Sequence, residues 1–166
     1  MSPDTMTRLR TTINGRELEL EIESREMLID LLRDRLQLTG TKRSCDSQVC
    51  GACTVLLDGQ PVSSCCTLAY EADGKEVETI EGLAQNGQLD PIQAAFVEKA
   101  AIQCGFCTPG FVLTTKAMLA ENARPTRDEI KSYLGGNICR CTGYWNILDA
   151  AEEAARRVRG DVEAGT

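Results

Sequence analysis

Residues 45–53 read CDSQVCGAC, which puts Cys45, Cys50 and Cys53 on one short loop. Gly51 and Ala52 carry almost no side chain, so backbone N–H groups can approach a ligand held by the three sulfurs. Thiolate-bound metal centres are anionic, and amide donors offset the cost of burying them. The loop therefore predicts a metal centre that needs a fourth cysteine from a neighbouring segment.

The spacing of these cysteines indicates the kind of centre. Cys-x4-Cys-x2-Cys followed by a distant cysteine is the plant-type pattern for a [2Fe–2S] cluster. Zinc bound by the same four cysteines is the alternative, but x4 followed by x2 on one loop suits zinc poorly. Cys65 and Cys66 are both available as the fourth ligand. We expect both on a strand, where adjacent side chains point to opposite faces, so one faces the cluster and the other is a small buried hydrophobe. Spacing alone does not choose between them.

Four more cysteines form a second quartet. They are Cys104, Cys107, Cys139 and Cys141. A Cys-x2-Cys pair with a Cys-x-Cys pair is not the plant-type pattern, and Cys-x-Cys is too cramped for a typical zinc knuckle. Both pairs precede predicted helices, whose N-termini stabilise negative charge. The residues alone favour a second [2Fe–2S] cluster over zinc.

The composition excludes several other chemistries. The 166 residues include nine cysteines and no histidine, which rules out Cys2His2 zinc, Rieske-type iron, haem with a proximal histidine and Cys–His nucleophilic pairs. A net charge of −7 disfavours nucleic acid and anionic membranes as partners. The sequence contains no apolar run of membrane-spanning length and no signal-peptide or twin-arginine pattern. We therefore expect a cytoplasmic protein without membrane insertion, whose cysteines are ligands rather than disulfides.

The first half of the chain has the alternation of strands. The predicted strands are residues 7–14, 17–22, 54–57, 61–67 and 76–80. Gly15 supplies the first hairpin turn, and Ser24 is predicted to cap a helix with Leu28, Leu31 and Leu32 on its apolar face. This order predicts a small mixed sheet wrapped around one helix.

The second half has the period of helices. Residues 91–101, 111–121, 126–134 and 145–158 all fit amphipathic helices. Cysteine-bearing turns join them, which predicts a compact four-helix bundle. The predicted organisation has four parts. They are a flexible N-terminus (1–6), a ferredoxin-like domain (7–83), a helical cluster-binding domain (84–160) and a flexible tail (161–166).

Three stretches carry a resemblance to a known family. They are CGACTV (50–55), QCGFCTPG (103–110) and CRCTGY (139–144), with Glu81-Gly82-Leu83 between the halves. With them, the chain resembles the small iron–sulfur subunit of the molybdenum hydroxylases, which include xanthine dehydrogenase, aldehyde oxidoreductase and carbon monoxide dehydrogenase. The resemblance implies an α+β chain, with a plant-type ferredoxin-like (β-grasp) domain followed by a four-helix-bundle domain. It also implies that Cys65 is the fourth plant-type ligand.

The family implies partners and a direction of electron flow. A large subunit would hold molybdopterin, in its cytosine dinucleotide form, and a medium subunit would hold FAD, in a dimer of heterotrimers. Electrons would pass from molybdenum through the second quartet, then through the first, to flavin. By the same analogy Gln103 and Cys141 approach the pterin, although Gln103 is also suited to capping a helix. This chain would perform no substrate chemistry itself.

One departure and two alternatives remain. The family often has glycine where this chain has Ser44, because glycine permits an unusual backbone angle. The first alternative is a free-standing two-cluster ferredoxin, and the second is a zinc-stapled interaction module without redox function. The substrate and the final acceptor are not encoded in this chain.

Overall fold

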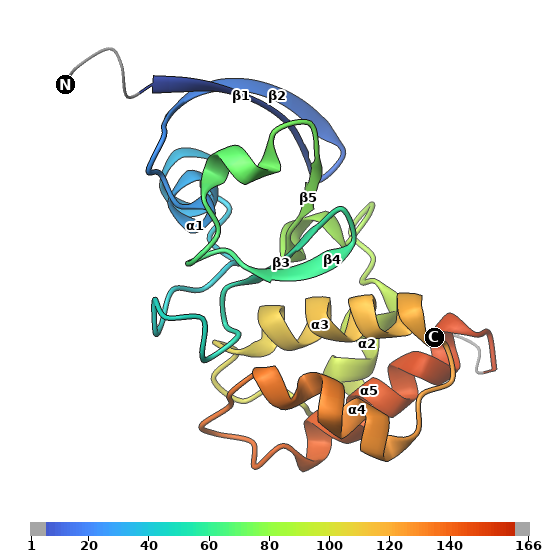
Figure 1. The fold of residues 1–166 in the computed structure, drawn as a ribbon. Coiled ribbons are helices and arrows are strands. Elements are labelled where there is room, and N and C mark those ends of the chain that lie inside the picture. Colours follow the sequence, from blue (N-terminus) through green and yellow to red (C-terminus); the bar gives the residue numbers. More distant parts are fainter. Residues whose placement is uncertain (1–5, 162–166) are drawn as a thin grey trace.

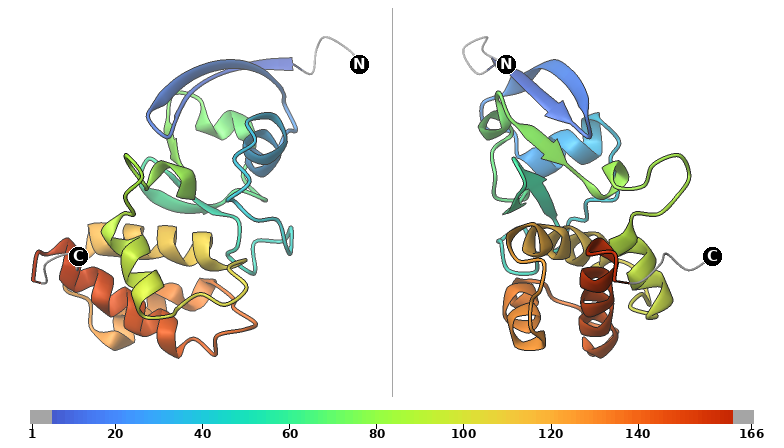
Figure 2. Two further views of the ribbon diagram at one scale, coloured as in Figure 1. Left: turned by 180° about the vertical axis from the view of Figure 1, so that it is seen from behind. Right: turned by 90° about the vertical axis from the view of Figure 1, so that its right-hand side faces the viewer.

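The computed structural model describes residues 6–161 as a sheet domain packed on a helical domain (Figure 1). The turned views in Figure 2 show the helices gathered on one side of the sheet domain, with α3 next to the sheet. The predicted α+β class, with the sheet first and four helices second, is confirmed. The flexible ends predicted at 1–6 and 161–166 fall almost entirely outside the described residues.

The sheet has five strands in the order β2-β1-β5-β3-β4. The strands are β1 (Met6–Ile13), β2 (Arg16–Glu23), β3 (Thr54–Leu57), β4 (Gln60–Ser63) and β5 (Glu76–Glu78). β1 pairs in parallel with β5, and the other neighbours are antiparallel. Asn14 and Gly15 turn the first hairpin with φ angles of 51° and 76°, which an Asn-Gly pair adopts readily. The predicted mixed sheet is therefore confirmed.

The second hairpin is shorter than predicted. β4 ends at Ser63, and the chain turns at once: the carbonyl of Ser63 accepts the N–H of Cys66 at 2.9 Å. Cys65 and Cys66 therefore lie in a turn, and strand alternation does not separate their side chains. The expectation that both cysteines lie on a strand, with their side chains on opposite faces, was therefore wrong.

The helix of the sheet domain differs from its prediction at the N-terminus. α1 (Leu28–Asp30) continues into a π-helical turn, Leu31–Arg35, and begins after Met27 without a side-chain cap. Ser24 lies in the preceding turn, so its predicted capping role was wrong. The predicted apolar face is correct, because Leu28, Leu31 and Leu32 are buried against the sheet. Two 3-10 turns complete this domain, at Ala69–Ala72 and Ile80–Gly82.

β3 joins the two halves because it is buried on both faces. Val55 and Leu57 point into the core of the sheet domain, whereas Leu56 packs into the helical core. Its neighbour across this boundary is α3, which runs beneath the strand in Figure 1. Lys116 of α3 also forms an ion pair with Glu78 of β5. The two domains are therefore joined by the packing of Leu56 into the helical core and by this ion pair.

The helical domain contains α2 (Pro91–Glu98), α3 (Thr108–Glu121), α4 (Arg127–Tyr133) and α5 (Trp145–Val158), with a 3-10 turn at Leu134–Gly136. Asp90 caps α2 by accepting the N–H of Ile92, and Thr126 caps α4. α3 is not amphipathic as predicted, because the sheet covers one side of it and the other helices cover the rest. None of the described helices is both long and apolar enough to cross a membrane.

A buried carboxylate holds the end of α5. The Glu153 side chain is 6% exposed and lies 3.1 Å from Nε of Arg157, 2.7 Å from Arg156 and 3.6 Å from Lys99. Burial alone would raise the pKa of Glu153, but the hydrogen bond from Arg157 and the charges of Arg156 and Lys99 lower it below 4.5. The charged form is therefore favoured in the folded chain.

Glu153→Gln should destabilise the chain by about 2 kcal/mol at pH 7. Breaking a buried pair costs about 3–5 kcal/mol, reduced here because Arg157 keeps Glu98 as a partner. Because the pKa of Glu153 is lower in the folded chain, its carboxylate stabilises the folded state above pH 4.5, and this stabilisation is lost as the pH falls through the folded-state pKa. The difference in stability between the variant and wild type should therefore shrink in acid. Denaturant unfolding at pH 7 and pH 4 measures this. Glu152→Gln, at a side chain 36% exposed, is the control and should change stability by less than about 1 kcal/mol.

Candidate iron–sulfur sites

The loop that carries the first quartet forms a cradle of backbone amides. Asp46 and Gln48 have φ angles of 51° and 59°, so left-handed residues alternate with ordinary ones between Cys45 and Cys50. Such alternation turns successive N–H groups inward and makes an anion-binding concavity. Hydrogen bonds from the amides of Ser47, Cys50 and Val49 lower the pKa of the Cys45 thiol to about 6. The amide donors to the Cys45 sulfur therefore come from residues 47–50 of the loop.

Cys53 and Cys65 lie together at the base of this loop. Both are buried, and they pack with Ile29 in a small cluster beneath the sheet. Burial and, to a smaller extent, hydrogen bonding to the neighbouring Cys65 thiol raise the pKa of the Cys53 thiol to about 12. Cys66 is exposed, with its sulfur 3.6 Å from that of Cys65. The prediction that the cysteine not facing the cluster is a small buried hydrophobe is therefore wrong for Cys66, which is exposed.

The second quartet forms two pairs of sulfurs. The sulfurs of Cys104 and Cys141 are 3.5 Å apart and exposed, and Cys107 and Cys139 form the inner pair. Burial raises the pKa of the Cys107 thiol to about 12. Burial opposes ionisation of Cys139 as well, yet the hydroxyl and amide of Thr142 donate to its sulfur at 3.1 and 3.4 Å and lower its pKa. All four predicted residues are therefore brought together.

Helix starts bracket this second quartet as predicted. Cys107 is the residue before α3, and Tyr144 is the residue before α5. Tyr144 has a φ of 70°, its hydroxyl accepts the N–H of Cys139 at 3.1 Å, and its ring packs edge-on against Phe111. Thr142 and Tyr144 support the site and were not singled out from the sequence. The sequence feature that could have indicated them is their position in the stretch CRCTGY (139–144), directly after Cys139 and Cys141.

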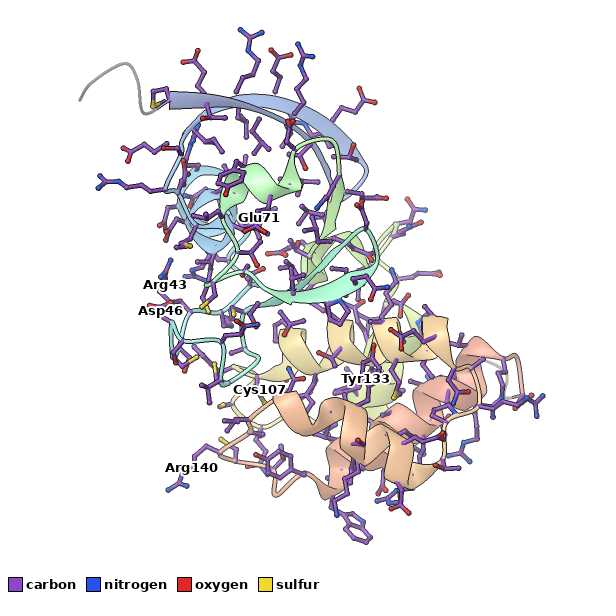
Figure 3. All side chains as sticks on the ribbon, in the orientation of Figure 1. Arg43, Asp46, Glu71, Cys107, Tyr133 and Arg140 are labelled. Atoms are coloured by element: carbon purple, nitrogen blue, oxygen red, sulfur yellow. The ribbon has the colours of Figure 1, made fainter. Side chains whose placement is uncertain are left out.

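The two quartets meet at the domain boundary. The N–H of Ile138 donates to the carbonyl of Cys50 at 2.9 Å, and Nδ2 of Asn137 donates to the carbonyl of Gly51 at 3.0 Å. In Figure 3 sulfur atoms gather along one side of the molecule, between the loop of Arg43 and Asp46 and the loop of Arg140, with Cys107 at the junction. A direct backbone hydrogen bond therefore links a cysteine of one quartet to the residue before a cysteine of the other.

The grouping of sulfurs suits two-iron clusters. The second quartet presents its sulfurs as two pairs, Cys104 with Cys141 and Cys107 with Cys139, and each iron of a [2Fe–2S] cluster binds two thiolates. Amide and hydroxyl donors directed at the sulfurs match the negative charge of such a cluster. The residues present therefore fit the predicted cofactor.

Two other predicted positions are exposed. Gln103 forms no side-chain hydrogen bond within the described part of the chain, and α3 begins without a side-chain cap, so the capping interpretation has no support. Ser44 is exposed, and its φ is not in the left-handed region. Glycine is therefore not required there, and serine causes no backbone strain.

The fold and the two cysteine quartets define a two-domain iron–sulfur protein, and comparisons with known proteins identify its family. Residues 11–84 match the family model of the 2Fe-2S iron-sulfur cluster binding domain, and residues 79–152 match that of the [2Fe-2S] binding domain. The nicotine 6-hydroxylase small subunit of Paenarthrobacter nicotinovorans is 43% identical over 95% of this chain and 94% of its own length. A probable xanthine dehydrogenase subunit of Bacillus subtilis is 44% identical over 95% of this chain and 91% of its own.

A solved structure agrees with these relatives. Quinoline 2-oxidoreductase from Pseudomonas putida 86 has a chain with a TM-score of 0.88 and 46% sequence identity, covering 95% of this chain and 99% of that one. The chain belongs to the small [2Fe–2S] subunits of the molybdenum hydroxylases, the xanthine dehydrogenase and aldehyde oxidoreductase family. It is an iron–sulfur electron-transfer subunit of a multisubunit oxidoreductase, with two [2Fe–2S]-binding domains.

Proposed function

We propose that the chain holds one cluster with each quartet. Cys45, Cys50, Cys53 and Cys65 would hold the plant-type cluster, and Cys104, Cys107, Cys139 and Cys141 the cluster of the helical domain. When bound, each cluster accepts and releases a single electron. The chain's own residues supply the amide cradle at Cys45 and the Thr142 donors at Cys139, which stabilise the added negative charge. The domain boundary falls between residues 83 and 84.

The chain would relay electrons between two partners. Electrons would come from the cytosine dinucleotide form of molybdopterin in a large subunit and enter at the helical-domain cluster. They would leave from the plant-type cluster to FAD in a medium subunit. The single observation that carries this proposal is the hydrogen bond from Ile138 to Cys50, which holds the two quartets side by side. Each quartet also reaches the surface, the second through Cys104 and Cys141 and the first through the exposed loop around Val49.

Exposed apolar side chains near the second quartet support the inference that a permanent partner binds there. Large hydrophobic residues are exposed close to it in sequence: Ile102, Phe106, Ile138, Tyr144 and Trp145, the last 68% exposed. Contiguous exposed apolar surface marks interaction sites, and a free-standing carrier would leave these groups in water. We therefore favour a subunit in a dimer of heterotrimers over an independent ferredoxin. Gln103 and Cys141, both exposed, would face the pterin across this contact.

We also propose the cytoplasm as the location of the complex. None of the nine cysteines forms a disulfide, as expected in a reducing compartment. Assaying the purified complex with N-heterocycles and aldehydes, using an artificial dye acceptor, tests the substrate class.

EPR spectroscopy of the reduced complex tests the relay. Two different ligand environments should give two distinguishable [2Fe–2S] signals, and about four iron atoms should be bound per small chain. Gel filtration of the native preparation should show co-elution with larger chains that contain molybdenum and flavin. A single EPR signal would contradict the two-cluster assignment. An 18.1 kDa monomer with full redox activity would instead establish the free-standing carrier.

A further inference from the structure

Cys66 is the one cysteine of this chain outside both quartets, and its position is unusual for a residue without a role. It directly follows Cys65 in the turn after β4, and the two sulfurs are 3.6 Å apart. The side chain is exposed, so it contributes nothing to a hydrophobic core. A packing role does not explain it.

The turn after β4 holds Cys66 beside Cys65. Its N–H donates to the carbonyl of Ser63, and the hydroxyl of Thr67 donates to the same carbonyl at 3.1 Å, which fixes the bend. The Cys66 sulfur therefore adjoins the sulfur of a proposed ligand, Cys65.

We propose that Cys66 is a reserve ligand of the plant-type cluster, able to bind the iron in place of Cys65. This inference rests on the proposed assignment of Cys45, Cys50, Cys53 and Cys65 as ligands. A short shift of the turn suffices to exchange the sulfurs, because they are already 3.6 Å apart and neither is held in a strand. Cys53 has no such neighbour, since Ala52 and Thr54 flank it in the chain.

The exchange balances without an electron donor or acceptor. Sγ of Cys66 would replace Sγ of Cys65 as the fourth thiolate ligand, one iron–sulfur bond breaking as the other forms, and the proton of the Cys66 thiol would pass to the departing Cys65 thiolate. The charge and oxidation state of the cluster would not change, and its fourth ligand would become an exposed cysteine.

Alanine variants in the purified complex test the proposal, since alanine cannot ligate iron. Cys65→Ala should keep about four iron atoms per small chain and a plant-type EPR signal with shifted g values. The double variant with Cys66→Ala should keep only about two, together with the helical-domain signal. Cys53→Ala is the matched control and should also lose the plant-type cluster. The helical-domain signal reports correct folding in every variant.

Equal iron loss in Cys65→Ala and in the double variant would overturn the inference while leaving the proposed relay intact. Absence of a plant-type signal from the wild-type complex would instead overturn the proposed function. Loss of that signal in Cys66→Ala alone would make Cys66 the primary ligand and refute its reserve role.

A second measurement avoids any folding defect in Cys65→Ala. Cys66→Ala removes only an exposed thiol, so the complex should assemble normally. During incubation with an iron chelator, its plant-type EPR signal should decay several-fold faster than in wild type, because a dissociated Cys65 has no replacement. The helical-domain signal should decay at the same rate in both proteins. Identical decay of the plant-type signal would refute the reserve role.

Discussion

Cys139→Ala should abolish the helical-domain cluster and lower substrate-driven reduction of flavin in the complex by more than about a hundredfold. Cys139 is the buried member of the inner sulfur pair, and Thr142 donates two hydrogen bonds to its sulfur. Loss of an outer hydrogen-bonding partner of a metal ligand already costs about 10–100-fold, so loss of the ligand itself should cost more. The measurement is anaerobic mixing of the complex with substrate while flavin absorbance is followed.

The same variant tests the order of the two clusters. Dithionite reduces exposed centres directly, so it should still generate the plant-type EPR signal in Cys139→Ala, whereas substrate should not. Cys53→Ala is the matched control, because it removes a cysteine of the other quartet that is also buried. In that variant substrate should still reduce the helical-domain cluster, but flavin should stay oxidised. Substrate-driven reduction of the plant-type cluster in Cys139→Ala would contradict the proposed order.

The elements of both domains follow closely from local sequence, because the signals that define them are local. Asn14-Gly15 requires a hairpin, and the prediction of α5 at 145–158 agrees with its bounds. Local reasoning failed at Ser24, where an isolated capping preference competed with the extended segment that leads to Met27. It failed again at α3, whose burial on all sides depends on a sheet formed by distant residues.

The cysteines that form each quartet could be grouped from their spacing, but their surroundings could not. The exposure of Cys66 depends on where β4 ends, which no residue pattern specified. The amide cradle depends on the positive φ angles of Asp46 and Gln48, and neither residue type is confined to that conformation. The contact between the quartets joins Gly51 to Asn137, residues far apart in the chain. Such pairings arise from tertiary packing and leave little trace in one sequence.

Gly110→Ala should separate the two domains at this contact and lower stability by about 2–4 kcal/mol. A Cβ at Gly110 would lie closer than 3.0 Å to the carbonyl oxygen of Gly51, which belongs to rigid backbone beside Cys50. Overpacking costs about 1–3 kcal/mol, and loss of the buried hydrogen bond from Asn137 to Gly51 adds about 1–3 kcal/mol. Helix propensity opposes this effect by only about 1 kcal/mol in favour of alanine. The melting temperature should fall by roughly 5–15 °C.

Gly135→Ala is the control that separates packing from conformational preference. Gly135 lies in the 3-10 turn after α4, and a Cβ there would meet nothing within 4 Å. Its substitution should change the melting temperature by no more than about 4 °C, since only propensity is altered. In Gly110→Ala, separation of Cys50 from Ile138 should also slow reduction of the plant-type cluster by substrate more than reduction of the helical-domain cluster. Equal melting temperatures for the two variants would show that the glycine contact does not hold the domains together. Equal slowing of both clusters in Gly110→Ala would show that the electron route between the quartets depends on other contacts.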